Sequence, residues 1–111
     1  MNTTDFKKLC EKRLNKVAQT LTEKASEYSR GDRLSNFKRL ANLQRSTPEK
    51  VCLGLVGKHI VALYDFVNDI DKSVFQSEER WNEKIGDIMA YMLLLEALIK
   101  ERRMLQENDK V

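Results

Sequence analysis

The chain has 111 residues, of which 33% are charged, with 20 Lys and Arg against 17 Asp and Glu and a formal net charge of +3 at pH 7. This length predicts a single domain, 1–111, and the composition, with four Gly and one Pro, excludes a disordered chain. The longest uncharged run, 88–95, is far shorter than the roughly 20 apolar residues of a membrane span, so no membrane segment is expected. The N-terminus lacks the apolar core of a signal sequence, which favours a cytoplasmic location.

Charge is distributed unevenly along the chain. Residues 1–50 carry 12 Lys and Arg against 6 Asp and Glu, whereas residues 51–111 carry 8 against 11. A basic half suits phosphate groups, nucleic acid or the acidic half of a neighbouring subunit, and it is also compatible with an ordinary solvated surface. The two cysteines, Cys10 and Cys52, have no metal-binding spacing and are expected to be reduced.

The first predicted helix covers 1–28, with Thr3 or Thr4 as its N-cap. Apolar residues recur there at steps of three and four and define one face: Phe6, Cys10, Leu14, Val17, Leu21, Ala25 and Tyr28. The segment 29–46 is predicted to be a loop followed by a short helix from about Ser35 to Leu43. Gly31 suits the break because glycine accepts a positive φ.

The third predicted helix covers 47–70 and begins with Thr47 as N-cap and Pro48 at the first helical position. Gly54 and Gly57 are unusual inside a helix and allow another backbone to come close. The fourth helix covers 77–105, with Ser77 as N-cap. Its apolar residues occupy more than one face, which indicates neighbours on two sides. The prediction is an all-α bundle of about four helices, completed by oligomerisation, most simply as a two-fold dimer.

Two groups of polar residues are predicted to form one shared binding site for a charged ligand. Arg30, Asp32, Arg33 and Asn36 surround the start of the short helix, where an Arg fork suits a phosphate. The second group lies on the third and fourth helices and consists of Lys58, His59, Lys84, Asp87 and Tyr91. The alternative is structural: helix caps, salt bridges and a histidine that packs in the core.

Carboxylates spaced by four residues offer a candidate metal site. Asp65 and Asp69 share one face of the third helix, and Glu83 and Asp87 share one face of the fourth. Two such pairs facing each other would form an oxygen cage that suits Mg²⁺. The same residues are equally compatible with a solvated surface.

The stretch 83–94, E-K-I-G-D-I-M-A-Y-M-L-L, resembles the second metal-binding helix of the MazG-like, all-α nucleoside triphosphate pyrophosphohydrolases. Together with G-D-R-L-S-N-F at 31–37 and G-K-H at 57–59, it is similar to small phage and prophage proteins of that fold. The resemblance implies a helical oligomer in the bacterial cytoplasm that cleaves a nucleoside triphosphate with Mg²⁺. Asp87 matches the aspartate of the second motif in this family.

Other positions depart from the family pattern. Lys84 stands where a metal-binding glutamate is expected, Glu83 matches a less critical acid, and the first motif, E-E-x-x-E, has no good equivalent around Lys58, Ala62 and Asp65. A lysine removes a ligand and adds a cation to the cage, but it could hold a phosphate directly. The resemblance therefore implies binding of a nucleotide or similar ligand, with degenerate Mg²⁺-dependent hydrolysis as one possibility and sequestration of a host signal nucleotide as another.

Two other functions are compatible with the sequence. A protein-interaction or inhibitor module could dock on a host protein through its long C-terminal helix and the basic patch at 100–103, without small-molecule turnover. Nucleic-acid binding through the basic first helix is less favoured, because Glu11, Glu23 and Glu27 interrupt the basic residues Lys7, Lys8, Lys12, Arg13 and Lys16.

Overall fold

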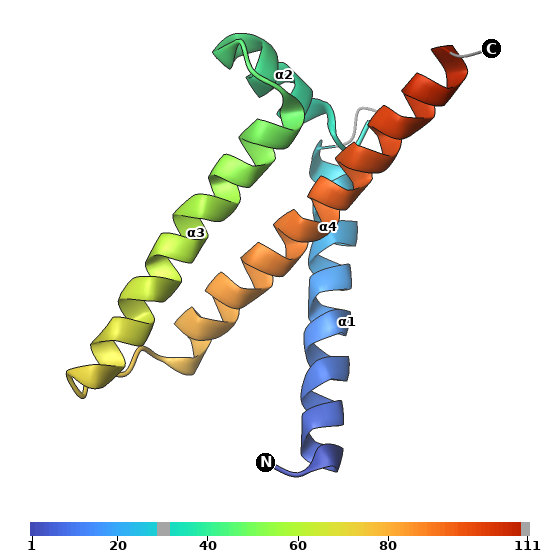
Figure 1. The fold of residues 1–111 in the computed structure, drawn as a ribbon. Helices are drawn as coiled ribbons and strands as arrows, with labels where there is room; N and C mark the ends of the chain where they lie inside the picture. The colour runs from blue at the N-terminus through green and yellow to red at the C-terminus, as the bar shows by residue number, and fades with distance from the viewer. Residues whose placement is uncertain (29–31, 110–111) are drawn as a thin grey trace.

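The computed structural model describes residues 1–28 and 32–109, and it describes the side chains of all of these residues except 24–28. It contains four helices: α1 (Thr3–Tyr28), α2 (Ser35–Gln44), α3 (Pro48–Asp71) and α4 (Glu78–Asp109). No strand occurs within these ranges, so the predicted all-α class with four helices is confirmed (Figure 1). The fourth helix extends to Asp109, beyond the predicted end at Leu105.

Side-chain caps define three helix starts. The Thr47 side chain accepts a hydrogen bond from the Lys50 amide at 3.3 Å, and Ser77 Oγ accepts one from the Arg80 amide at 3.2 Å, as predicted. At α1 the cap is Asn2, whose side chain accepts from the Asp5 amide at 2.8 Å. The prediction of Thr3 or Thr4 was therefore wrong, because the helix begins before the residue that was expected to cap it.

Helices α3 and α4 form an antiparallel hairpin, which is the main packing unit. The edge of the Trp81 ring meets Phe66 near the turn, with ring centroids 5.3 Å apart. At the other end, Arg102 Nη2 donates to Glu49 Oε2 at 2.8 Å. The main core lies between α2 and this hairpin and consists of Leu34, Phe37, Ala41, Val51, Cys52 and Leu98.

Helix α1 packs on another side of α4 and runs in the same direction. The Arg13 guanidinium donates to the carbonyl of Asn82 at 3.0 Å and to its side-chain oxygen at 2.9 Å. Gly86 allows this approach, since a Cβ there would lie 3.0 Å from Arg13 Nη1. In the predicted apolar face of α1, Val17 is buried, but Phe6 and Leu14 are more than half exposed.

The molecule is open and elongated, as Figure 1 shows. Its extents are 56 × 32 × 27 Å and its radius of gyration is 17.1 Å. A compact chain of this length has a radius of gyration of about 13 Å. Many large apolar side chains are accordingly exposed.

Helix α3 is also long and apolar enough to cross a membrane, judged by length and composition alone. The length of uncharged runs does not reveal this property of α3, because Lys58 and Asp65 interrupt its apolar residues. Length and composition are a weak indication, since core helices of soluble proteins meet the same criterion.

Candidate functional site

The antiparallel hairpin brings His59 of α3 opposite Asp87 and Tyr91 of α4. His59 Nδ1 lies 4.0 Å from Asp87 Oδ2, and the rings of His59 and Tyr91 stack with centroids 5.5 Å apart. The side chains are partly buried, with 20% of His59 and 35% of Asp87 exposed. Predicted site residues from two helices therefore meet in one polar cluster, which we call the His59 cluster.

Apolar contacts hold the His59 cluster in place along the hairpin. One face of Tyr91 belongs to the layer that packs against the main core. The Cys52 thiol donates to the Tyr91 carbonyl at 3.5 Å, and burial raises the pKa of this thiol. On the side toward the turn, Phe66 is buried against Trp81. The cluster is thus the polar part of an interface that is otherwise apolar, and such groups require partners.

Two lysines lie next to the His59 cluster in sequence. Lys84 is one helical turn before Asp87 on α4 and is partly buried, whereas Lys58 precedes His59 and is exposed. Both can place an ammonium group near an anion held by the cluster. The region therefore combines one imidazole, one carboxylate and one phenol with two flexible lysine side chains.

The predicted loop residues form a second polar group at the start of α2. The Asp32 carboxylate accepts from the Leu34 amide at 2.9 Å and from Lys38 Nζ at 2.7 Å. Lys38 also forms an ion pair with Glu101 of α4. The hydrogen bond from Lys38, followed by that from the Leu34 amide, lowers the pKa of Asp32, and the bonds to Asp32 and Glu101 raise the pKa of Lys38. Asp32 thus fixes the loop that leads into α2.

The two polar groups contact α4 at different places, one through Asp87 and the other through Glu101. Asp87 and Glu101 are separated by 14 residues of one continuous helix, and at 1.5 Å per residue this corresponds to about 21 Å. A single nucleotide-sized ligand therefore does not touch both carboxylates in one chain. Asn36 is exposed on α2, and Arg30 lies outside the described residues.

Arg33 lines a shallow hollow between α1 and α4. The other lining residues are Leu21, Thr22, Leu93, Leu94 and Ala97. Arg33 is the one cationic residue in this lining, and most of the other residues are apolar. We therefore regard the hollow as a packing feature of the α1–α4 contact.

The predicted metal-binding carboxylates do not converge within the described residues. No group of three or more His, Cys, Asp or Glu there could hold a metal ion. Asp65 and Glu83 are exposed, Asp69 accepts from Gln76 Nε2 at 3.3 Å, and Asp87 faces His59. Within the described part of one chain, these four carboxylates therefore do not surround a common point, as the oxygen ligands of Mg²⁺ do.

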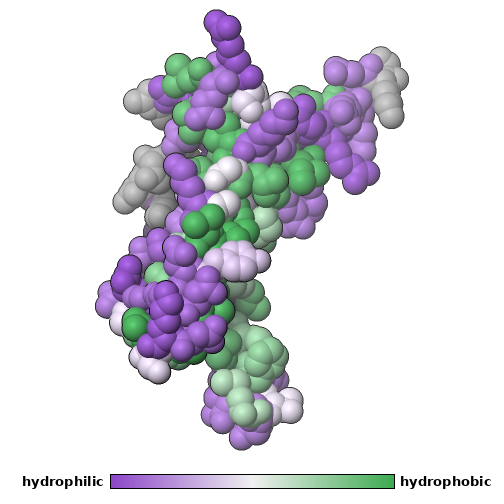
Figure 2. All heavy atoms as spheres, turned by 60° about the vertical axis from the view of Figure 1, so that its left-hand side comes forward, coloured by the Kyte–Doolittle hydropathy of each residue, from purple (hydrophilic) through white to green (hydrophobic). Residues whose placement is uncertain are grey.

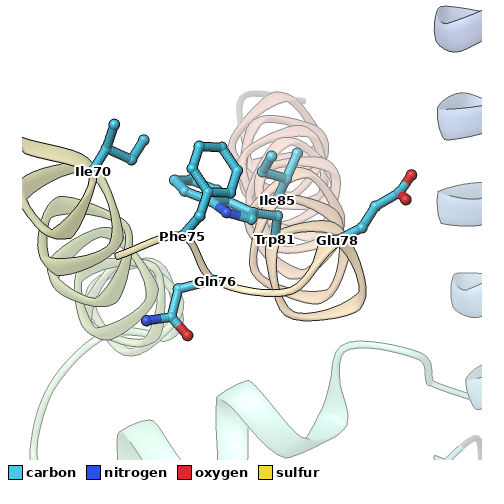
Figure 3. A pocket seen from close by; sticks show the side chains of 6 residues that line it. All are labelled: Ile70, Phe75, Gln76, Glu78, Trp81 and Ile85. Carbon is cyan, nitrogen blue, oxygen red and sulfur yellow. The ribbon is translucent and has the colours of Figure 1, made fainter. Parts of the chain in front are cut away.

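The sequence did not indicate an apolar hollow at the turn between α3 and α4. Figure 3 shows the rings of Phe75 and Trp81 between Ile70 and Ile85, while Glu78 points away from them. Trp81 Nε1 is buried and has no hydrogen-bond partner within the described chain. The sequence feature that could have predicted this hollow is the set of aromatic residues around the turn. Phe66, Phe75 and Trp81 can meet only if the hairpin closes there.

Comparisons with known proteins give no match to this chain, whether against family models, curated proteins or solved structures.

Proposed function

We propose that the chain binds a phosphate-bearing ligand of the nucleotide type at the His59 cluster and holds it without hydrolysis. The observation that carries the proposal is the partly buried pairing of His59 with Asp87, stacked on Tyr91, between two otherwise apolar helices. Perturbed or paired polar groups in such a setting are more often found at functional sites than on ordinary surfaces.

The roles of the side chains follow from their chemistry. The Asp87 carboxylate lies 4.0 Å from His59 Nδ1, across the contact between α3 and α4. The imidazole can donate a hydrogen bond to a phosphate oxygen. Lys84 adds a positive charge, and the Tyr91 ring offers an aromatic neighbour for a base or sugar.

Capture without turnover is supported by the carboxylates. Hydrolysis of a nucleoside triphosphate by this kind of fold would need several acidic ligands around Mg²⁺. Here Asp65 and Glu83 are exposed and Asp87 is directed toward His59. The resemblance to MazG-like proteins supports a nucleotide as the ligand class, and Lys84 in place of a glutamate supports binding through cations.

Isothermal titration calorimetry with ATP, dATP and inorganic pyrophosphate, each with and without Mg²⁺, tests the proposal. We expect saturable binding that does not require Mg²⁺. His59→Gln removes the imidazole donor and should weaken binding by about 10-fold or more, because a hydrogen bond to a charged group such as a phosphate contributes roughly 1.5–3 kcal/mol. Lys100→Gln, on an exposed part of α4 distant from His59, is the matched control and should bind like the parent chain.

A second variant separates capture from degenerate catalysis. Lys84→Glu restores an acid at the position where the resemblance implies a metal ligand. If the chain only captures anions, this variant loses affinity for ATP and gains no pyrophosphate release. Mg²⁺-dependent binding by the parent chain, or hydrolysis by Lys84→Glu, would contradict capture without chemistry. No binding of any of the three ligands would contradict the proposed function itself.

A further inference from the structure

The side of α3 that faces away from α4 is apolar along most of its length. Residues Leu53, Gly57, Ile60, Tyr64 and Val67 follow one another at alternating steps of four and three. This spacing places them on one stripe of the helix, on the side away from His59 and Phe66. We call it the outer α3 face.

The outer α3 face is exposed in the single chain. Leu53 is 54% exposed, Tyr64 68% and Val67 52%, and Val61 beside the stripe is 61% exposed. Figure 2, in which the side carrying α3 comes forward, shows hydrophobic side chains at the surface among hydrophilic ones. Contiguous exposed apolar surface of this kind marks an interaction site in soluble proteins.

Gly57 forms a notch in the outer α3 face. Nothing lies within 4 Å of the position that a Cβ on Gly54 or Gly57 would occupy. Glycine in a helix interior costs about 1 kcal/mol relative to alanine. Packing inside this chain does not explain that cost, whereas the close approach of a second helix would.

We infer that the outer α3 face binds the outer α3 face of a second copy of the chain, antiparallel and about a two-fold axis between Ile60 and Val61. This arrangement places Gly57 opposite Tyr64 of the second copy, so that the most exposed ring on the face fills the notch. It also places Leu53 within one residue of the position opposite Val67. The inference does not depend on the proposed ligand, because His59 lies on the opposite side of α3.

The charges on α3 favour the antiparallel direction. Lys50 and Lys58 lie in its N-terminal half and Asp65 and Asp71 in its C-terminal half, and all four are exposed. Antiparallel pairing brings Lys50 next to Asp71 of the second copy, whereas Lys58 and Asp65 lie off the outer α3 face. Parallel pairing would place like charges together, which is unfavourable. Opposed helix dipoles favour the same direction.

The exposed surface area of the chain supports pairing with a second copy. The chain exposes 8804 Å². A compact monomer of its mass exposes about 6,300 Å², so each chain has an excess of about 2,500 Å². Obligate homodimers bury roughly 2,000–5,000 Å² in total, which matches the excess of two chains. A lipid bilayer is the less suitable occupant, because Lys58 and Asp65 lie near the middle of α3, where charge is costly in hydrocarbon.

Size-exclusion chromatography with light scattering on the full chain, at concentrations from about 1 to 100 µM, tests the pairing. We expect twice the chain mass of 13.0 kDa. Tyr64→Glu brings a carboxylate into the pairing face and should raise the dissociation constant by about 100-fold or more. Leu43→Glu is the matched control, since Leu43 is 82% exposed on α2 away from this face, and it should remain dimeric.

Gly57→Leu distinguishes loss of pairing from loss of folding. A Cβ at position 57 has no neighbour within 4 Å and leucine has a better helix propensity than glycine, so the single chain should keep its circular dichroism spectrum. It fills the notch, however, and should yield monomers. A dimer that survives both Tyr64→Glu and Gly57→Leu would overturn the inference.

Cross-linking tests the direction. In a Cys10→Ser background, a mixture of Leu53→Cys and Val67→Cys chains should form a disulfide between the two kinds of chain, and neither variant should cross-link with itself. Self-cross-linking of both variants would show parallel pairing and overturn the arrangement. A mass of 13.0 kDa at about 100 µM, with or without flotation on anionic lipid vesicles, would overturn the pairing altogether.

Discussion

At the scale of single residues, most of the charged side chains for which the structure shows a partner stabilise the fold. Asp32 receives hydrogen bonds from the Leu34 amide and from Lys38, and Lys38 links the loop to Glu101 of α4. Residue types alone suggested a ligand-binding role for Asp32. Its hydrogen bonds show that it also orders the entry to α2, a role that sequence spacing could not separate from binding.

Asp32→Asn tests this structural role through its pH dependence. The folded-state pKa of Asp32 lies below its ordinary value of 3.8, chiefly because of Lys38. The ionised carboxylate therefore stabilises the folded state above about pH 4, and this contribution is lost as the pH falls through the lowered pKa. Because the pair is partly exposed and screened by solvent, we expect a difference of at most about 1 kcal/mol.

The measurement is urea unfolding of the parent and Asp32→Asn chains at pH 7, 5, 4 and 3. The difference in free energy of unfolding should be constant between pH 7 and 5 and should shrink toward pH 3. Glu107→Gln, at the exposed end of α4, serves as the control. An equal difference at pH 7 and pH 3 would show that the charge of Asp32 is not what matters.

At the scale of helices, the sequence was most informative where local chemistry is decisive. The caps Thr47 and Ser77 were predicted because a side-chain oxygen satisfies amides that have no partner in the helix. The burial of α1 was predicted less well: the periodicity of Phe6 and Leu14 identifies an apolar face, but it does not say whether a neighbour covers it. Both side chains are more than half exposed.

Thr47→Ala should destabilise the chain by about 1 kcal/mol, because the Lys50 amide loses its acceptor at the start of α3. Thermal unfolding followed by circular dichroism measures the effect. Ser46→Ala, one residue earlier and exposed, removes a hydroxyl without touching the cap and should be nearly neutral. Equal destabilisation by the two changes would mean that the hydrogen bond from Lys50 has no measurable role.

At the scale of the whole molecule, the long helix α4 decides which predicted site residues can cooperate. It carries Asp87 and Tyr91, the partners of His59, near the middle of the hairpin, and it carries Glu101, the partner of Lys38, about 21 Å further along. The sequence identified both polar groups but not their separation, since this depends on where α2 packs along α4. The same open arrangement leaves the outer α3 face without a neighbour in the chain.

The most direct test of ligand capture at the His59 cluster uses the fact that His59 is the only histidine in the sequence. Its ring signals can therefore be followed by nuclear magnetic resonance without ambiguity while ATP or pyrophosphate is added in the absence of Mg²⁺. We predict a saturable shift of both ring signals, with the same dissociation constant that calorimetry gives, and a much weaker response in Lys84→Gln. Ring signals that do not move while either ligand binds would contradict the assignment of the site to His59, Asp87 and Tyr91.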